Sequence, residues 1–331
     1  MAPAGGGYLS DAHVVAEGLA FPEGPVALLD GSVLVVEMQR GTLTKVRPDG
    51  RTEVVAEPGG GPNGAAIGPD GAAWLCNNGG FPSTGKGRIE RVDLARGSVE
   101  VVLTDAGGEP LRAPNDIVFD RTGGFWFTDY GAHGRRRSVP GGIYYVPAGA
   151  DQAEAVVECG QAEPVARGSA VRAFEMCFPV AAPNGIGLSP DGTRLYWSET
   201  ETRSVQQRRL SGPGVLAPSA GNTVATVLRG QPLDTEQLLV GLPGNRLLDS
   251  LALDAEGYVA VGTLLDSGIT VVAPDGTWEL ARLPAACADR MVTNICFGGP
   301  DRRTAWVTLS ETGRLVSATW PRPGLALAFD A

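Results

Sequence analysis

The sequence predicts an all-β fold, a six-bladed β-propeller, from three observations. A short motif centred on an acidic or amide residue occurs six times, at intervals of 40 to 69 residues. Each motif is followed by apolar runs that break at Gly-rich turns. No long segment has the 3.6-residue apolar period of an amphipathic helix. The motif centres are Glu23, Asn63, Asn115, Asn184, Asp249 and Asn294.

Each repeat contains the elements of one blade. The motif predicts the first strand, and a turn such as Asp30-Gly31 or Asp70-Gly71 connects it to the second strand. Second strands are expected at 33–37, 73–77, 125–129, 195–199, 258–263 and 305–310. Third strands are expected at 41–47, 87–93, 142–146, 204–210, 268–273 and 313–319.

The two ends of the chain are expected to meet. Residues 13–20 resemble a fourth strand but have no blade before them, so we expect them to complete the sixth blade. Such a closure removes an exposed sheet edge. Residues 1–331 are therefore predicted to form a single propeller domain. Two segments, 161–180 and 211–240, exceed the period; we expect them to shape the channel mouth and substrate size, with packing on the outer blades as the alternative.

Composition and charge exclude several classes of function. The net charge of −10 argues against nucleic-acid binding, which needs a basic surface. No signal peptide and no apolar run of membrane-spanning length is evident, so a cytoplasmic protein with a small-molecule substrate is expected. The two histidines, His13 and His133, are too few for a His-rich metal site, and no nucleophile elbow accompanies them.

The motif residues predict a metal site on the propeller axis. First strands line the channel of a propeller, so equivalent residues of all repeats converge there. Glu23, Asn115, Asn184 and Asp249 would supply two carboxylates and two amides. Such oxygen ligands suit one divalent cation, calcium first, with magnesium, manganese or zinc as alternatives. A single Asn before Gly is common in turns, but oxygen at all six positions favours a site. Asn63 and Asn294 either line the pocket or bond the channel backbone.

Three motifs together resemble a known family. Residues 21–25 (FPEGP), 114–120 (PNDIVFD) with 127–129 (FTD), and 183–192 (PNGIGLSPDG) are similar to motifs of the gluconolactonase, regucalcin (senescence marker protein) and luciferin-regenerating-enzyme family. The resemblance spans nearly the whole chain. It implies a six-bladed propeller with one catalytic divalent metal, usually hydrolysing sugar lactones.

The resemblance also implies roles for individual residues. Glu23, Asn184 and Asp249 match metal ligands, and Asn115 matches a metal- or substrate-binding amide. Asp249 further matches the general base or nucleophile. Three departures leave the substrate open: Leu248 and Ser250 replace the usual Pro and Gly around Asp249, Arg112 stands three rather than two residues before Asn115, and Tyr130 replaces the usual Pro after Asp129.

The functional hypothesis is a divalent-metal-dependent lactonase. The cation would polarise the lactone carbonyl while Asp249 acts as base or nucleophile. Alternatives on the same scaffold are a phosphotriesterase-like enzyme, a ring-modifying enzyme of secondary metabolism, and a non-catalytic calcium-binding propeller. Candidates for the substrate pocket are Asn63, Cys76, Asn77, Arg112, Asn115, Tyr130, His133 and Glu199.

Overall fold

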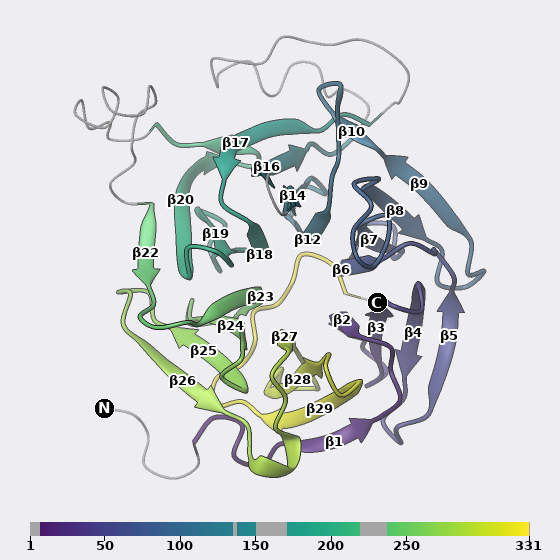
Figure 1. Ribbon diagram of the computed structural model, residues 1–331, viewed down its shortest axis with the longest axis vertical. Helices are drawn as coiled ribbons and strands as arrows, with labels where there is room; N and C mark the ends of the chain where they lie inside the picture. Colours follow the sequence, from purple (N-terminus) through teal and green to yellow (C-terminus); the bar gives the residue numbers. More distant parts are fainter. Residues whose placement is uncertain (1–6, 135–137, 150–170, 219–236, 331) are drawn as a thin grey trace.

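Six blades surround a central channel, as the sequence predicts (Figure 1). The computed structural model describes residues 7–134, 138–149, 171–218 and 237–330. Each innermost strand contacts the next one around the ring, and the last contacts the first. The innermost strands are β2 (Pro22–Ala27), β6 (Pro62–Ile67), β12 (Pro114–Phe119), β18 (Pro183–Leu188), β23 (Leu247–Leu253) and β27 (Val292–Gly298).

Each blade is an antiparallel sheet that runs outward from its innermost strand. In blade 1, β2 is followed by β3 (Val33–Glu37), β4 (Thr42–Val46) and β5 (Thr52–Ala56). In blade 2, β6 is followed by β7 (Ala73–Asn77), β8 (Arg88–Val92) and β9 (Val99–Leu103). In blade 3, β12 is followed by β13 (Phe125–Asp129), β16 (Gly141–Val146) and β17 (Phe174–Val180).

The other three blades follow the same plan. Blade 4 holds β18, β19 (Arg194–Glu199), β20 (Ser204–Gly212) and β22 (Leu238–Gly241), with β21 (Val215–Leu216) also paired to β20. Blade 5 holds β23, β24 (Val259–Leu264), β25 (Gly268–Val272) and β26 (Trp278–Arg282). Blade 6 holds β27, β28 (Thr304–Leu309) and β29 (Arg314–Thr319). Two short hairpins are β10 (Asp105–Ala106) with β11 (Glu109–Pro110), and β14 (Ala132–His133) with β15 (Ser138–Val139).

The N-terminal strand closes the ring. The strand β1 (His13–Ala16) pairs with β29, placing His13 opposite Ser317, and becomes the outermost strand of blade 6 (Figure 1). This closure confirms the prediction for residues 13–20, although the strand is shorter than expected. In the described ranges, the helical segment is the short turn η1 (Ala285–Cys287), and no helix there has the length and apolar character needed to cross a bilayer.

The apolar core lies between neighbouring blades. Strand β3 is buried along its whole length, and its Leu34 and Val36 pack with Ile67 and Leu75 of blade 2. Strands covered on both faces read as continuous β-branched and aliphatic runs. Burial of these side chains stabilises the ring by about 25 cal/mol per Å² of apolar surface. The core thus fixes the spacing of the innermost strands.

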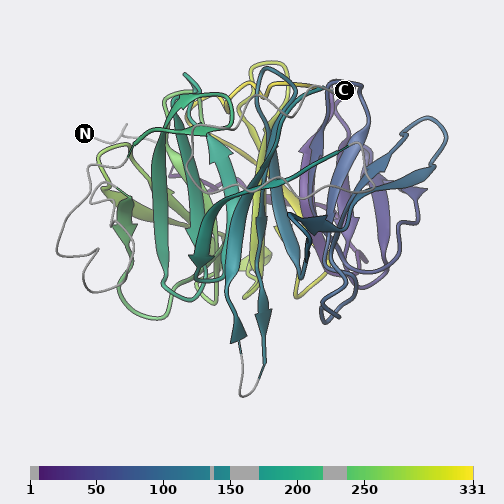
Figure 2. The ribbon, with the colours of Figure 1, turned by 90° about the horizontal axis from the view of Figure 1, so that it is seen from above.

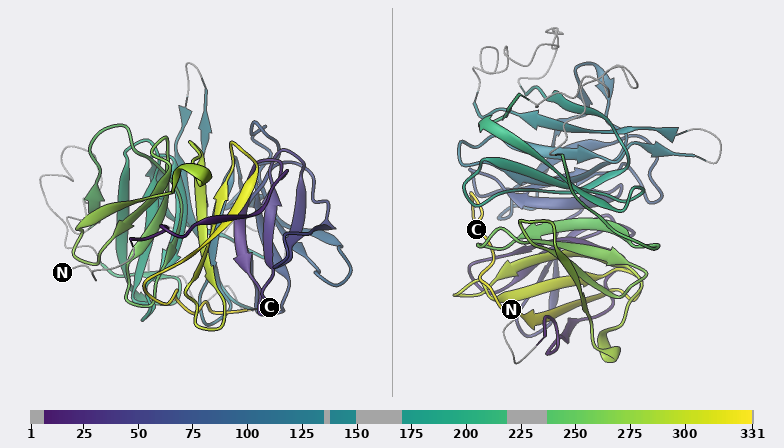
Figure 3. Two further views of the ribbon diagram at one scale, coloured as in Figure 1. Left: turned by 90° about the horizontal axis from the view of Figure 1, so that it is seen from below. Right: turned by 90° about the vertical axis from the view of Figure 1, so that its left-hand side faces the viewer.

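The channel has two different ends. We call the end where the innermost strands begin the motif end, because Glu23 and Asp249 lie there, and the opposite end the far end. The β14–β15 hairpin follows β13 at the motif end and projects beyond the blades (Figure 2). The chain terminates on the opposite face (Figure 3).

A C-terminal strap, residues 321–330, crosses the far end (Figure 1). Its Arg322 forms an ion pair with Asp254 and lies over the ring of Tyr258 at 3.7 Å. Further along, the Phe329 ring meets Phe119 edge-on at 5.9 Å. The strap therefore bridges blades 5 and 3 across the channel.

The connections that contain the two long segments leave strands β16 and β20 at the far end of the channel. Strand β16 ends at Val146, which pairs with the first residue of β13, Phe125. Strand β20 likewise ends at the far end, at Gly212. In their described parts these segments form outer strands of blades 3 and 4, which agrees with the alternative of packing on the outer blades, and their effect on substrate size stays a prediction. Residues 150–170 and 219–236 lie outside the described residues.

Candidate active site

A bulge in each innermost strand positions the motif residues. Pairing with the second strand shifts register at every motif, for example between Glu23 and Val26 and between Pro114 and Ile117. Bulges of this kind re-aim side chains and are common next to active sites. Close packing of neighbouring motifs also demands glycine: a Cβ on Gly64 would lie 2.5 Å from the Asn115 carbonyl oxygen.

Hydroxyl groups on the second strands fix the motif backbone of the next blade. Thr128 Oγ1 donates to the Asn184 carbonyl at 2.6 Å, and Ser198 Oγ donates to the Asp249 carbonyl at 2.6 Å. Ser310 Oγ closes the series by donating to the Pro22 carbonyl at 2.6 Å. These buried bonds hold the motif residues on rigid strands, as a precise site requires.

Glu23 is a buried carboxylate with two fixed donors. Its Oε2 accepts from Gly24 N at 2.7 Å and from Asn294 Nδ2 at 2.8 Å. Burial is the largest influence and raises the pKa of Glu23 to about 7, although both donors lower it. Asn294 therefore orients the Glu23 carboxylate through its Nδ2, while its Oδ1 accepts a hydrogen bond from Ile295 N on its own strand.

Asp249 interacts electrostatically with Glu23, although blade 6 separates the two residues around the ring. Burial raises the pKa of Asp249 well above its ordinary value, and the Glu23 carboxylate raises it further, while the Asn184 amide lowers it. The Asn184 amide is itself fixed, since its Nδ2 donates to Thr200 Oγ1 at 3.2 Å and its Oδ1 accepts from Ser250 Oγ at 3.3 Å. The predicted residues Glu23, Asn184 and Asp249 thus share one environment.

Asn115 presents an unsatisfied oxygen. Its side chain is buried, and Oδ1 has no hydrogen-bond partner among the residues that the structure describes. An unpaired buried amide oxygen is costly and calls for a specific explanation. The described residues bring no three His, Cys, Asp or Glu side chains together. The available donors are instead two carboxylates, on Glu23 and Asp249, and the amides of Asn115 and Asn184.

Asp116 is a functional candidate that the sequence reasoning missed. It is buried; its Oδ1 accepts from Ile117 N at 2.9 Å and its Oδ2 from Ile186 N at 3.3 Å. Burial raises the pKa of Asp116 to about 8, with a further contribution from Glu23. The signal was present, since this is the one motif of the six in which a carboxylate follows the motif centre, and three of the others have glycine there.

Polar residues at the ends of the second strands have structural roles. Asn77 Oδ1 accepts from Gly61 N at 3.0 Å and Gly79 N at 2.9 Å, which binds two loops together. Glu199 accepts from Trp197 Nε1 at 3.2 Å and Thr202 Oγ1 at 2.8 Å. Cys76 is fully buried in the core between blades 2 and 3. The prediction that Cys76 and Asn77 line the pocket is wrong, because both are fully buried, whereas the assignment of Glu199 stays a prediction.

Tyr130 and His133 lie at the motif-end rim. The Tyr130 hydroxyl bonds to the Thr200 side chain, and burial, with smaller effects of Asp249 and Glu201, raises the pKa of Tyr130. The exposed His133 ring meets Tyr130 edge-on at 4.9 Å, and its Nδ1 lies 3.0 Å from Glu201 Oε1. Tyr130 is therefore near Asp249 and Glu201, and His133 lies beyond Tyr130 on the exposed side of the rim.

Arg112 and Asn63 complete the predicted set. The Arg112 backbone is fixed by Asp129 Oδ2, which accepts from its N at 2.7 Å, while none of the described residues pairs with its guanidinium. Asn63 is buried on β6, and no described residue bonds to its side-chain amide. Both side chains thus keep hydrogen-bonding capacity for a ligand, and their assignment to the pocket stays a prediction.

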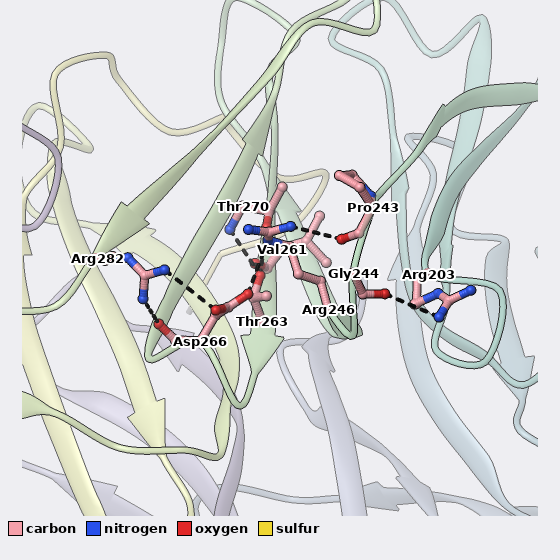
Figure 4. Close-up of polar contacts among 9 residues, drawn as sticks. All are labelled: Arg203, Pro243, Gly244, Arg246, Val261, Thr263, Asp266, Thr270 and Arg282. Atoms are coloured by element: carbon pink, nitrogen blue, oxygen red, sulfur yellow. Dashed lines mark hydrogen bonds and ion pairs between the residues drawn. The ribbon is translucent and has the colours of Figure 1, made fainter.

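Arginines at the rim of blades 4 and 5 are engaged in local contacts (Figure 4). Arg203 Nη1 donates to the Gly244 carbonyl at 3.1 Å, and Arg246 Nη1 donates to the Pro243 carbonyl at 2.8 Å. Asp266 forms ion pairs with both Arg246 and Arg282. These side chains stabilise the turns at this part of the rim, so we assign them a structural role.

A cavity of about 900 Å³ occupies the far half of the channel, beneath the C-terminal strap. Its mainly apolar lining includes Gly24, Asp116 and Asn294 but none of Glu23, Asn115, Asn184 and Asp249. We place the site at the motif end because the convergent carboxylates and amides are there, whereas the far cavity adds mostly aliphatic surface.

Comparison with known proteins identifies the family. Residues 21–311 match the family model described as SMP-30/gluconolactonase/LRE-like region. The chain belongs to this family. Among the curated relatives of this chain, the gluconolactonase of Zymomonas mobilis is 26% identical over 307 residues, covering 86% of this chain and 75% of the relative. The lactonase drp35 of Staphylococcus saprophyticus is 28% identical over 216 residues, covering 65% of this chain and 57% of the relative.

Solved structures share the fold. A gluconolactonase of Xanthomonas campestris superposes with a TM-score of 0.69 at 19% identity, covering 94% of this chain and 89% of that one. A calcium-binding protein, regucalcin, of Agrobacterium tumefaciens gives a TM-score of 0.65 at 18% identity, covering 95% and 97%. The family resemblance inferred from the three motifs is confirmed.

Proposed function

We propose that this protein hydrolyses a lactone and requires one divalent cation, calcium first, at the motif end of the channel. Family membership and relatives named gluconolactonase and lactonase support the reaction class. The observation that carries the proposal is the pairing of the buried Glu23 carboxylate and the partly buried Asp249 carboxylate with two buried amides, one of which has an unpaired oxygen.

The residues present fit a hard divalent cation. The Glu23 and Asp249 carboxylates, both with raised pKa values, would be stabilised in their charged forms by a cation, and the unpaired Asn115 Oδ1 would gain a partner. Glu23, Asn184 and Asp249 would hold the ion, with Asn115 as a further donor. When bound, the cation supplies Lewis-acid polarisation of the substrate carbonyl.

Asp249 is the proposed proton acceptor. A carboxylate oxygen of Asp249 takes a proton from water as the water oxygen attacks the lactone carbonyl, and the ring C–O bond then breaks. The proton returns to the leaving alkoxide to give the hydroxy acid. Direct attack by the Asp249 carboxylate is the alternative route, in which water then cleaves the acyl intermediate. Thr200 and Ser198 support this residue by fixing the carbonyls of Leu248 and Asp249.

Four other residues are proposed to bind and orient the substrate. Tyr130 is near Asp249 and presents a hydroxyl at the rim. Asn63 and Arg112 offer uncommitted polar groups, and His133 borders Tyr130. Asn63 lies on blade 2 and the other three residues border blade 3, so together they would contact one side of a substrate ring.

A lactone panel tests the proposal. The protein is treated with chelator, and ester-bond cleavage of δ- and γ-lactones is measured before and after adding calcium, magnesium, manganese or zinc. We expect little activity without metal and recovery with at least one ion. Circular dichroism must show an intact fold throughout. Metal binding without hydrolysis of any lactone would favour a non-catalytic calcium-binding propeller, and full activity in chelator would contradict the metal requirement.

A further inference from the structure

Two aromatic rings form an exposed pair at the motif end. Phe21, two residues before Glu23, leads into the innermost strand of blade 1, and Phe81 belongs to the loop between β7 and β8 of blade 2. Their ring centroids are 4.7 Å apart and the planes are inclined by 45°. Phe81 remains 41% exposed, and no described residue other than Phe21 forms a ring contact with it.

The backbone of Phe21 is held in an unusual conformation. Its φ is +58°, in the left-handed region that bulky residues rarely occupy. Backbone bonds hold it there: Met38 N donates to the Phe21 carbonyl at 3.1 Å, and Gln39 N donates to the Ala20 carbonyl at 3.1 Å. Such strained residues persist where the surroundings fix them, and they cluster at binding sites.

The loop that carries Phe81 is fixed at its start and in its middle. Asn78 N donates to the Gly61 carbonyl at 2.8 Å, which anchors the start of the loop to blade 2. Ser83 Oγ donates to the Arg112 carbonyl at 3.3 Å, which ties its middle to blade 3 beside Asn115. Phe81 is therefore an exposed apolar ring on a well-anchored loop between blades 1 and 3, on the motif-end side.

We propose that Phe21 and Phe81 form an apolar wall of the substrate pocket, selecting lactones whose ring carries an alkyl or aryl substituent. The inference rests on the proposed lactonase function and specifies its substrate class. An apolar substituent lying against the rings removes apolar surface of both partners from water, whereas the hydroxyls of a sugar lactone would lose hydration there. Aromatic pairs of this geometry also accept a third ring in tilted contact.

A structural alternative is that the two rings only brace the loop against blade 1. The two accounts differ in ligand preference. The wall predicts that removal of the Phe81 ring weakens ligands with an apolar substituent and spares the unsubstituted ring. The brace predicts an equal effect on both ligands, through displacement of the whole loop.

Calorimetry with unreactive lactams separates the two accounts. Binding of δ-valerolactam and of its phenyl-substituted form is compared for the metal-loaded wild type, Phe81→Ala and Phe178→Ala. Phe178 is a matched control, a 43% exposed phenylalanine that also precedes proline, on the outer strand β17. We expect the wild type and Phe178→Ala to prefer the phenyl lactam about tenfold or more, and Phe81→Ala to lose most of that preference.

Two further variants keep the test decisive. Phe81→Leu retains apolar bulk and should retain part of the preference, whereas Phe81→Gln, long but polar, should lose it even if the alanine variant is misfolded. Equal lactam affinities in the wild type, including failure to bind either lactam, would overturn the wall, and so would an unchanged preference in both Phe81→Ala and Phe81→Gln.

Turnover of the matching lactones distinguishes the wall from the proposed function. If neither lactone is hydrolysed but the phenyl lactam preference depends on Phe81, the lactonase proposal fails and the wall stands. If both lactones are hydrolysed with a kcat/KM ratio that Phe81→Ala leaves unchanged, the function stands and the wall fails.

Discussion

Asn294 donates to Glu23 through a 2.8 Å hydrogen bond that joins positions 271 residues apart. It connects the last blade to the first, so the closure of the ring directly orients one of the two carboxylates of the proposed site. The bond is buried, and the adjacent backbone Gly24 N also donates to the Glu23 carboxylate. Completion of the propeller and assembly of the site are thus linked in a single contact.

Replacement of Asn294 should weaken cation binding. Asn294→Ala removes a donor that orients Glu23, and loss of a residue that supports a metal ligand typically costs 10- to 100-fold in affinity. We expect calcium affinity measured by calorimetry to fall about tenfold with the fold retained. Asn245→Ala, at an exposed site, is the matched control. Equal affinities for wild type and Asn294→Ala would show that the bond is not needed to position Glu23.

The metal-free protein should lose stability as pH rises. Folding raises the pKa of Asp116 to about 8 and of Glu23 to about 7, so between about pH 4 and 8 the folded state binds more protons than the unfolded state. Protonation of these two acids contributes its full stabilisation below their pKa values in the unfolded state. This contribution is lost as the pH rises through their pKa values in the folded state. Urea midpoints in chelator should therefore decline across this range.

Asp116→Asn should flatten this decline, because the amide cannot ionise. Glu100→Gln, at an exposed carboxylate on an outer strand, should leave it unchanged. If the wild-type and Asp116→Asn midpoints fall in parallel from pH 5 to pH 8, Asp116 is not the source of the pH dependence.

The C-terminal strap should stabilise the far end through Arg322. Its partner Asp254 is almost fully buried, so Arg322→Ala leaves a buried charge without its cation and removes the contact with Tyr258. We expect a loss of roughly 3 kcal/mol in the free energy of unfolding, measured by urea denaturation. Arg51→Ala, which removes the exposed pair with Asp49, should leave the midpoint unchanged. Similar midpoints for both variants would mean that the strap contributes little.

The repeat pattern was sufficient to predict the ring and the innermost strands that carry the motif residues. Asp-Gly turns fix hairpin lengths, and the second strands at 33–37, 73–77 and 125–129 match their predicted bounds. Strand direction then places equivalent residues at one end of the channel, which is why Glu23, Asn184 and Asp249 could be grouped from sequence. Contacts between neighbouring blades, by contrast, leave no local pattern in the sequence.

Three features therefore escaped prediction. Asp116 lies one residue past the motif centre, and only the bulge of β12 explains why both it and Asn115 are buried. Asn77 resembles a site residue in sequence, but its orientation toward loop backbone depends on the register of blade 2. The strap depends on contacts such as Arg322 with Asp254, 68 positions apart, and no repeat period encodes them.

The most direct test of the account is the turnover of Asp249→Asn at full cation occupancy. The substitution retains an oxygen ligand and the side-chain volume but removes the oxygen that accepts a proton or attacks the carbonyl. With calorimetry showing bound metal, and Glu256→Gln as an exposed control, kcat on the best lactone of the panel should fall by about 10²- to 10⁴-fold. A fully metallated Asp249→Asn enzyme with near-normal kcat would contradict the assignment of the chemistry to Asp249.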